Sequence, residues 1–184
     1  MLVYLSLGAN LGNREETINI ALDLLTEQVG TLVRRSSFFY SKPWGFDSEN
    51  DFCNICASFR TSLAPIDLLL TTQSIERALG RKEKSNGTYH DRTIDIDIIR
   101  AFDDNGEEIQ CEIPNPNSPI SRLPLLAIPH PLWQQRDFVK VPLAEIMQSF
   151  CIFLPKNLCI PNKSSTFAAA LKKERAQCAR LWWF

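Results

Sequence analysis

The sequence predicts an α+β fold with a ferredoxin-like βαββαβ core, an antiparallel sheet with helices packed on it, and C-terminal additions. The first observation is that strand-like and helix-like patterns follow one another in this order up to residue 102. The second is an ordinary globular composition, because the 184 residues are 45% hydrophobic and 22% charged. A chain of this length buries a core without a structural metal or disulfides, so we expect one domain.

The first three core elements are a strand, a helix and a strand. Residues 3–7 form a short apolar run that Gly8 ends, which predicts the first strand. Residues 15–28 carry apolar side chains at helical spacing and predict the first helix. Residues 31–40 predict one continuous strand, and a loop follows at residues 41–45, where proline and glycine interrupt the pattern.

The next three elements complete the core. Residues 51–61 predict a strand, and residues 65–79 predict a helix with proline in its first turn and glycine after its end. Residues 93–102 are rich in β-branched isoleucine and predict the last core strand. Asp-Asp-Asn-Gly at residues 103–106 is typical of a hairpin turn, so residues 109–113 are expected to return as the partner strand.

The residues after the core predict less regular structure. Seven of the eleven prolines lie between residues 114 and 142, so we expect a long irregular connection with room for one short helix. Helical patterns return at residues 142–149 and 166–180. We therefore interpret residues 1–150 as the functional domain and residues 151–184 as an extension that packs on this domain or trails it.

Charge and hydropathy argue against two classes of partner. The net charge is −1 and the pI is about 6.1, which argues against the broad basic surface of a nucleic-acid-binding protein. No run of about 18 apolar residues predicts a membrane span, and the N-terminus lacks the pattern of a signal peptide. The six cysteines are then expected to be reduced thiols in a cytoplasmic protein.

The strongest local signal for chemistry is the pair of aspartates in the last core strand. Side chains on a strand alternate, so Asp95 and Asp97 share one face, with their Cα atoms about 6.6–6.8 Å apart. Two half-buried carboxylates this close repel unless a cation lies between them, and hard oxygen ligands favour Mg²⁺. Two such ions could hold a phosphoryl group that is being transferred. The alternative is the solvated outer face of an edge strand, which the pattern alone fits equally well.

Three weaker signals point to a phosphate and a flat heterocycle. Basic residues cluster between residues 77 and 92, in and beside a predicted loop, although a solvated helix end would look the same. His130 and Arg136 could hold phosphate oxygens, and Phe138 offers an apolar ring, unless this is only a rigid proline loop. Phe52 and Asn54 share a strand face and could stack a planar base and bind its edge, although a core Phe and a strand-end Asn are common.

Taken together, these residues resemble the 6-hydroxymethyl-7,8-dihydropterin pyrophosphokinase family, enzymes of folate synthesis with a ferredoxin-like fold. The resemblance extends over nearly all of residues 2–150, which we therefore interpret as a pyrophosphokinase domain. It rests on the order and spacing of several motifs taken together. The matching segments are residues 4–12, 36–38, 51–54, 61–65, 73–76, 80–81, 92–97, 128–131 and 136–138.

The resemblance implies a reaction and a role for each matching residue. A pyrophosphoryl group passes from ATP to the hydroxymethyl group of the pterin, and AMP leaves. The metal ligands would be Asp95 and Asp97, holding two Mg²⁺ ions, and the catalytic residues would be Arg81, Arg92, Asp95 and Asp97. ATP would contact Gln73, Lys84, Arg92, Ile98, His130 and Arg136. The pterin would contact Ser41, Lys42, Pro43, Trp44, Phe52, Asn54, Tyr89, Asp95 and Phe138.

The sequence also departs from the family pattern. The segment before Arg92 usually reads Trp-Gly-Pro, whereas here it reads Tyr89-His90-Asp91 in a loop that is one residue longer, and Glu83 replaces a residue that is often basic. Two alternatives therefore stay open: a catalytically weak homologue that binds pterin or nucleotide, and a ferredoxin-like RNA-binding module. The near-neutral charge and the aspartate pair oppose the second alternative. The expected partners are small molecules, and the chain is expected to be a monomer or a weak dimer.

Overall fold

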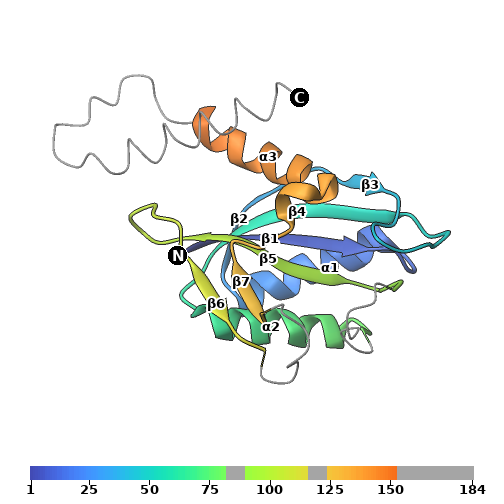
Figure 1. Cartoon of the computed structure of the whole chain (residues 1–184), viewed down its shortest axis with the longest axis horizontal. Coiled ribbons are helices and arrows are strands. Elements are labelled where there is room, and N and C mark those ends of the chain that lie inside the picture. Colours follow the sequence, from blue (N-terminus) through green and yellow to red (C-terminus); the bar gives the residue numbers. More distant parts are fainter. Residues whose placement is uncertain (82–89, 116–123, 153–184) are drawn as a thin grey trace.

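The computed structural model describes residues 1–81, 90–115 and 124–152, without the side chains of residues 148–152. In this part of the chain, five strands form the main sheet (Figure 1): β1 (Leu2–Ala9), β2 (Thr31–Arg35), β3 (Phe39–Ser41), β4 (Phe52–Arg60) and β5 (Asp95–Phe102). The order across the sheet is β2-β4-β1-β5, with β3 also paired to β4, and every pairing is antiparallel. This arrangement confirms the predicted α+β fold with an antiparallel ferredoxin-like sheet.

Helices cover both faces of the sheet. The helices α1 (Arg14–Gln28) and α2 (Pro65–Ala78) lie side by side on one face, and α3 (Asp137–Ile152) lies on the other (Figure 1). One apolar cluster fills the space under α1 and α2, and a second, smaller cluster packs β1, β4 and β5 against α3. Among the described residues, no helix is both long and apolar enough to cross a membrane.

The predicted strand at residues 31–40 is two strands, because Ser36 interrupts it. The Ser36 N–H donates to the carbonyl of Cys56 at 2.9 Å, and the Ser36 Oγ accepts the Cys56 N–H at 3.0 Å. The Ser36 hydroxyl therefore takes the place of a backbone carbonyl in the ladder. The next N–H, that of Ser37, donates to the Glu145 carboxylate of α3 at 3.0 Å. The chain then rejoins β4 as β3.

The hairpin predicted after β5 is only partly correct. The turn at residues 103–106 forms, and the Ile109 N–H donates to the Ala101 carbonyl at 2.9 Å, so the chain does return beside β5. The strand β6 (Cys111–Ile113), however, pairs with β7 (Leu126–Ile128) in a separate two-stranded sheet. This pairing joins residues far apart in the sequence, which a local pattern does not reveal.

The described parts of the connection predicted at residues 114–142, namely residues 114–115 and 124–142, hold more regular structure than expected. Besides β7 they contain a short 3-10 helix, η1 (Trp133–Gln135), and the start of α3. The helix predicted from Pro142 begins five residues earlier, because the carbonyl of Arg136 accepts the N–H groups of Val139 and Lys140 at 3.0 and 2.8 Å. Pro142 lies inside α3 and is not its start. The helix predicted at residues 166–180 lies outside the described residues.

Candidate active site

The alternation of β5 separates its isoleucines from its aspartates. Ile94, Ile96 and Ile98 lie in the apolar cluster under α1 and α2. Asp95 and Asp97 are half-buried and pair across the ladder with Gly8 and Ser6 of β1. All four of these residues line one pocket on the opposite face of the sheet, so the predicted shared face of the two carboxylates is confirmed.

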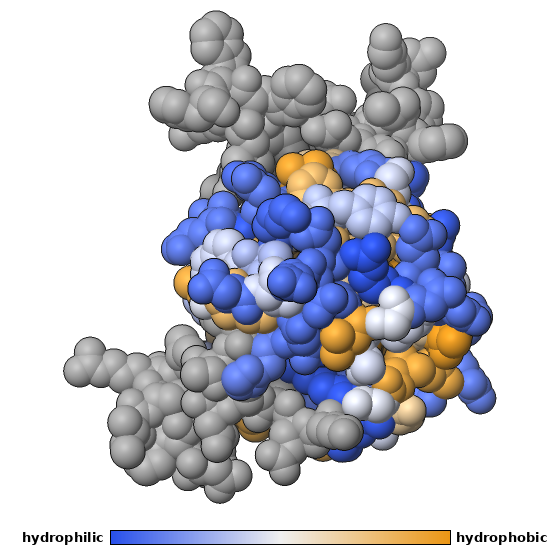
Figure 2. All heavy atoms as spheres, turned by 90° about the vertical axis from the view of Figure 1, so that its right-hand side faces the viewer, coloured by the Kyte–Doolittle hydropathy of each residue, from blue (hydrophilic) through white to orange (hydrophobic). Residues whose placement is uncertain are grey.

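This pocket lies on the α3 side of the sheet, at the end to which β1 and β3 run. Its empty volume is about 500 Å³, which includes the solvent at its mouth. The surface at this end is mixed, with exposed hydrophobic residues between larger hydrophilic areas (Figure 2). The lining residues are Ser6, Gly8, Ser41, Lys42, Trp44, Phe46, Phe52, Asn54, Arg92, Asp95, Asp97, Arg136 and Phe138.

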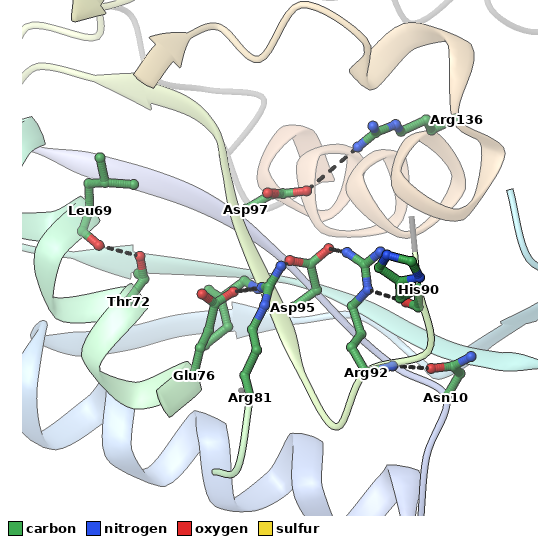
Figure 3. Close-up of polar contacts among 11 residues, drawn as sticks. Asn10, Leu69, Thr72, Glu76, Arg81, His90, Arg92, Asp95, Asp97 and Arg136 are labelled. Atoms are coloured by element: carbon green, nitrogen blue, oxygen red, sulfur yellow. Dashed lines mark hydrogen bonds and ion pairs between the residues drawn. The ribbon is translucent and has the colours of Figure 1, made fainter. Parts of the chain in front are cut away.

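Each pocket carboxylate faces arginine (Figure 3). Asp95 lies between two guanidinium groups, because its Oδ1 is 2.5 Å from Arg81 and its Oδ2 is 2.6 Å from Arg92. Asp97, on the same face, pairs with a different arginine, since its Oδ2 lies 3.5 Å from Arg136, which comes just before α3. The arginines therefore come from three separate segments and meet only in the folded protein. They balance the charge that two close carboxylates would otherwise leave in a half-buried site.

Arg81 also connects the pocket to the helix layer. Its guanidinium forms a second, very short ion pair with Glu76, which is only 2% exposed. The same Glu76 carboxylate accepts the N–H of Ile96 at 2.7 Å, so α2 and β5 are joined behind the pocket. Burial alone would lower the pKa of Arg81, but the carboxylates of Asp95 and Glu76 outweigh it and the pKa is raised. Arg81 is therefore fully charged.

The hydrogen bonds of Asn54 fix which way its amide points. Its Nδ2 donates to the carbonyl of Phe39 at 3.3 Å and to the Ser41 Oγ at 3.1 Å. A carbonyl can only accept, so the nitrogen must face Phe39 and the oxygen must face the other way. That oxygen lies over Gly8, 2.7 Å from the position that a Cβ there would occupy. Asn54 therefore presents an acceptor to the pocket.

Aromatic rings from three segments border the same space. Phe52 begins β4 and contacts Phe46 edge to face, with ring centroids 6.2 Å apart. The Arg136 guanidinium lies 4.9 Å from the Trp44 ring centroid and 5.9 Å from that of Phe138. Rings at these positions provide flat apolar surfaces next to the charged groups, which suits a ligand that is both aromatic and anionic.

His130 lies close to the carboxylates, at the end of β7. Its N–H donates to the carbonyl of Ile99 at 2.9 Å, and its Nδ1 accepts the N–H of Leu132 at 3.1 Å. Burial lowers the pKa of His130, and the nearby Asp97 carboxylate only partly opposes this. The imidazole is therefore neutral near pH 7, and since Nδ1 is an acceptor, the proton is on Nε2.

The structure gathers most, but not all, of the predicted site residues. Five of the predicted residues do not line the pocket: Pro43, Gln73, Arg81, Ile98 and His130. Arg81 contacts the pocket residue Asp95, and the Ile98 side chain is in the core, so only its backbone could reach a ligand. Lys84 and Tyr89 lie outside the described residues. The prediction missed Ser6, Gly8 and Phe46. Ser6 and Gly8 could have been found, because they share a face of a strand whose sequence matched the family, whereas nothing marked Phe46.

The oxygen donors in the pocket fit a magnesium ion whose remaining coordination positions are filled by water and by a bound substrate. No group of three His, Cys, Asp or Glu side chains suited to a metal occurs in the parts of the chain that the structure describes. Mg²⁺ does not need such a group, because it commonly binds one or two carboxylates together with waters and substrate phosphates. Asp95 and Asp97 offer this arrangement on a pocket wall. Cys53 and Cys56 do not add to it, because they are buried in separate apolar clusters on opposite faces of the sheet.

The comparisons with known proteins agree with this geometry. A family model described as 7,8-dihydro-6-hydroxymethylpterin-pyrophosphokinase (HPPK) matches residues 4–148. A protein of Porphyromonas gingivalis named 2-amino-4-hydroxy-6-hydroxymethyldihydropteridine pyrophosphokinase is 44% identical over 146 residues, covering 79% of this chain and 90% of that protein. A protein of the same name from Aquifex aeolicus is 36% identical over 144 residues, covering 78% of this chain and 79% of that protein.

A solved structure shows the same fold. The crystal structure of an HPPK-DHPS in complex with substrates matches with a TM-score of 0.56 at 15% sequence identity. The match covers 100% of this chain and 45% of that one, so this chain spans less than half of that protein.

Proposed function

Because the chain belongs to the 7,8-dihydro-6-hydroxymethylpterin-pyrophosphokinase family, we propose that its pocket holds ATP and the pterin side by side, with Asp95 and Asp97 as the ligands of two Mg²⁺ ions. The enzyme transfers a pyrophosphoryl group from ATP to 6-hydroxymethyl-7,8-dihydropterin, an early step in folate biosynthesis. The products are the pterin diphosphate and AMP.

The observation that carries the proposed site is the pair of half-buried carboxylates on one strand face, each facing arginine, beside aromatic rings. Within the described residues, Glu76, Asp95 and Asp97 balance Arg81, Arg92 and Arg136. A triphosphate entering this balanced site must therefore bring cations of its own. Asp95 and Asp97 would hold the Mg²⁺, which would supply positive charge to neutralise the phosphates.

The arginines would then exchange partners. In the ligand-free protein, Arg81, Arg92 and Arg136 pair with the carboxylates. If Asp95 and Asp97 held cations, these guanidinium groups could turn to the phosphate oxygens, which a planar guanidinium can bind through two hydrogen bonds. We therefore assign Arg81 and Arg92 to the transferred phosphates on the Asp95 side. Arg136 serves the Asp97 side, where its stacking on Trp44 fixes its direction.

The pterin would lie between the aromatic side chains, with its edge at Asn54. Phe52 and Phe138 both line the pocket, from β4 and α3, and could stack on the two faces of the ring system. The Asn54 Oδ1 is held as an acceptor, so it would bind an N–H of the pterin's amide edge and not its carbonyl. This pair of contacts would select a flat bicyclic acceptor and orient its hydroxymethyl group.

Chemistry needs no covalent enzyme intermediate. The hydroxyl oxygen of the pterin attacks the β-phosphorus in line, its proton is lost, and the bond from that phosphorus to the AMP oxygen breaks. The chain contributes position and charge: it holds acceptor and donor at reacting distance and neutralises the transferred group. His130 stays neutral, so its Nε2–H can donate to a phosphate oxygen without changing the charge of the site.

An assay of AMP formation tests the metal ligands. The wild-type protein should form AMP from ATP only when both the hydroxymethyl pterin and Mg²⁺ are present. Asp95→Ala and Asp97→Ala should each lower the rate at least ~10³-fold, because several kcal/mol of transition-state stabilisation are lost. Asp103→Ala, in the turn after β5, is the matched control and should keep full activity.

Two outcomes would change the conclusion. Near-normal turnover in both variants would exclude the two carboxylates as metal ligands. Calorimetric binding of the pterin by the wild-type protein without AMP formation would favour the catalytically weak homologue. The cytoplasmic location and the monomeric or weakly dimeric state stay predictions.

A further inference from the structure

Asp91 makes unusually many contacts for a residue just before the catalytic strand. Its Oδ1 accepts the Nδ2 of Asn10 at 2.6 Å, and its Oδ2 accepts the Nδ2 of Asn50 at 2.7 Å. The Ser48 hydroxyl is a third hydrogen-bond partner, and these bonds, Ser48 first, hold the pKa of Asp91 below its usual range although burial opposes them. One carboxylate thus joins the end of β1 to the segment that leads into β4.

The first of these partners, Asn10, holds the backbone of Arg92. The Asn10 Oδ1 accepts the Arg92 N–H at 2.7 Å, and the Asn10 N–H donates to the Arg92 carbonyl at 3.2 Å (Figure 3). Asn10 is only 3% exposed, so its side chain has little room to move. Since the Arg92 side chain reaches Asp95 at 2.6 Å, this backbone clamp sets the direction of a guanidinium in the pocket.

The second partner, Asn50, ends the loop that borders the acceptor side of the pocket. This loop, residues 42–50, carries Lys42, Trp44 and Phe46, all of which line the pocket. Asn50 is tied in two further ways: its N–H donates to the Ser48 Oγ at 3.1 Å, and its carbonyl accepts the Asn10 Nδ2 at 3.4 Å. The adjacent Asp51 carbonyl accepts an N–H of Arg14 at 2.6 Å. The end of the loop is therefore fastened at Asp91 and Asn10.

We propose that Asp91 is a positioning residue that fastens loop 42–50 to the clamped backbone of Arg92, and that it thereby sets the affinity for the pterin acceptor. The inference rests on the proposed function for the identity of the acceptor. Asp91 itself does not line the pocket, so it acts through the loop. Losing the link should weaken pterin binding more than ATP binding, because loop 42–50 carries three pocket-lining side chains. The arginines assigned to ATP keep contacts outside the loop: Arg136 keeps its ion pair with Asp97, and Asn10 still holds the Arg92 backbone.

The hydrogen bonds between Asp91 and its two asparagine partners can be tested by changing which groups donate and which accept. In Asp91→Asn, one amide oxygen must serve two NH₂ donors, so the new NH₂ group is left facing the Nδ2 of Asn10 or Asn50. We expect Asp91→Asn and Asn50→Ala each to raise the Kd and KM for the pterin about 10-fold, the effect of one lost hydrogen bond to a charged group. The KM for ATP should change much less.

Exchanging the two groups should restore binding. In the double variant Asp91→Asn, Asn50→Asp, the residue at 91 can accept from Asn10 and donate to the carboxylate at 50. Its pterin affinity should return close to the wild-type value, although each single change reduces it. A residue needed only for stability would not show this recovery. Asp103→Asn is the matched control, because Asp103 accepts N–H groups of its own turn at 2.9 and 2.8 Å, away from the pocket.

The measurements are calorimetric pterin binding, steady-state kinetics and the Tm of each variant. Wild-type pterin Kd in both Asp91→Asn and Asn50→Ala would overturn the proposal. So would an equal loss of pterin and ATP affinity, or a double variant no better than the single ones. Absence of AMP formation in the wild-type protein would instead contradict the proposed function, and the calorimetric comparison would still decide the role of Asp91.

Discussion

Gly8, on the wall of the pocket, is small for a steric reason. A Cβ at Gly8 would lie 2.7 Å from the Asn54 Oδ1 and 3.8 Å from the Phe52 ring. Asn54 cannot simply swing away, because its Nδ2 is bonded to Phe39 and Ser41. A side chain at residue 8 would therefore turn or displace the acceptor that is assigned to the pterin edge.

The first prediction concerns this contact. Gly8→Ala should weaken pterin binding about 10-fold, because the bond to the Asn54 oxygen is lost or bent. Stability should also fall by about 1–3 kcal/mol, because the buried Asn54 must shift to make room for the Cβ. The backbone adds no strain of its own, since Gly8 does not have a positive φ and lies in a strand. Calorimetry with the pterin and the thermal unfolding of the ligand-free protein measure the two quantities.

The matched control for Gly8 is Gly12. Its φ is +65° and no atom lies within 4 Å of a Cβ placed there, so Gly12→Ala meets strain without a clash. This variant should lose about 1 kcal/mol of stability and keep its pterin affinity. The reverse result, with pterin affinity lost in Gly12→Ala and kept in Gly8→Ala, would contradict the assigned orientation of Asn54.

For single residues, the sequence predicted which side chains share a face of a strand, but it did not predict which side chains pair with one another. Strand alternation alone placed Asp95 and Asp97 together, because it is a local property of the backbone. The pairing of Asp97 with Arg136 joins residues 39 positions apart and depends on where α3 begins, which the proline-rich stretch concealed. No pattern in the sequence pointed to Asn50 as a partner of Asp91 either.

At the scale of the elements, the buried Glu76 carboxylate of α2 connects this helix to β5. The Glu76 carboxylate on α2 accepts the Ile96 N–H at 2.7 Å and pairs with Arg81, while being 2% exposed. A buried carboxylate is tolerated only when its partners are complete. The connection also sets the position of Arg81 against Asp95, so the helix layer supports the pocket.

The second prediction tests this support. Arg81→Ala removes the guanidinium that pairs with the buried Glu76, and we expect a loss of about 3–5 kcal/mol of unfolding free energy. Glu76→Gln keeps an acceptor for the Ile96 N–H, so its loss should be smaller. Urea denaturation of the ligand-free variants measures both. An Arg81→Ala protein as stable as wild type would show that Glu76 finds another partner or takes up a proton.

The elements themselves were predictable where their signals were local. Periodicity and end signals gave α1, α2, β1, β4 and β5 to within a few residues. The break between β2 and β3 was not predicted, because Ser36 looks like an ordinary strand residue until its hydroxyl is seen to replace a backbone acceptor. The start of α3 was missed because Pro142 resembles a first-turn proline.

At the scale of the whole molecule, the sheet lies between most of the apolar core and the pocket. The larger apolar cluster lies under α1 and α2, while the pocket opens on the α3 side. This answers the RNA-binding alternative, since the sheet face that such a module would use carries Asp95 and Asp97 and is partly covered by α3. Both apolar clusters form from the chain's own side chains, and each pocket carboxylate is already balanced by arginine. Folding should therefore not depend on the metal.

The last prediction follows from this separation. EDTA should abolish AMP formation and leave the Tm of the ligand-free protein unchanged, and Mg²⁺ should restore the activity. A non-hydrolysable ATP analogue at about 100 times its Kd should stabilise the protein by about 2.7 kcal/mol, but only with Mg²⁺ present. For a chain of this size that is a rise in Tm of about 5–10 °C. A fall in Tm on adding EDTA alone would mean that a metal holds the fold together, whereas equal stabilisation by the analogue with and without Mg²⁺ would mean that the arginines bind the phosphates without the cations.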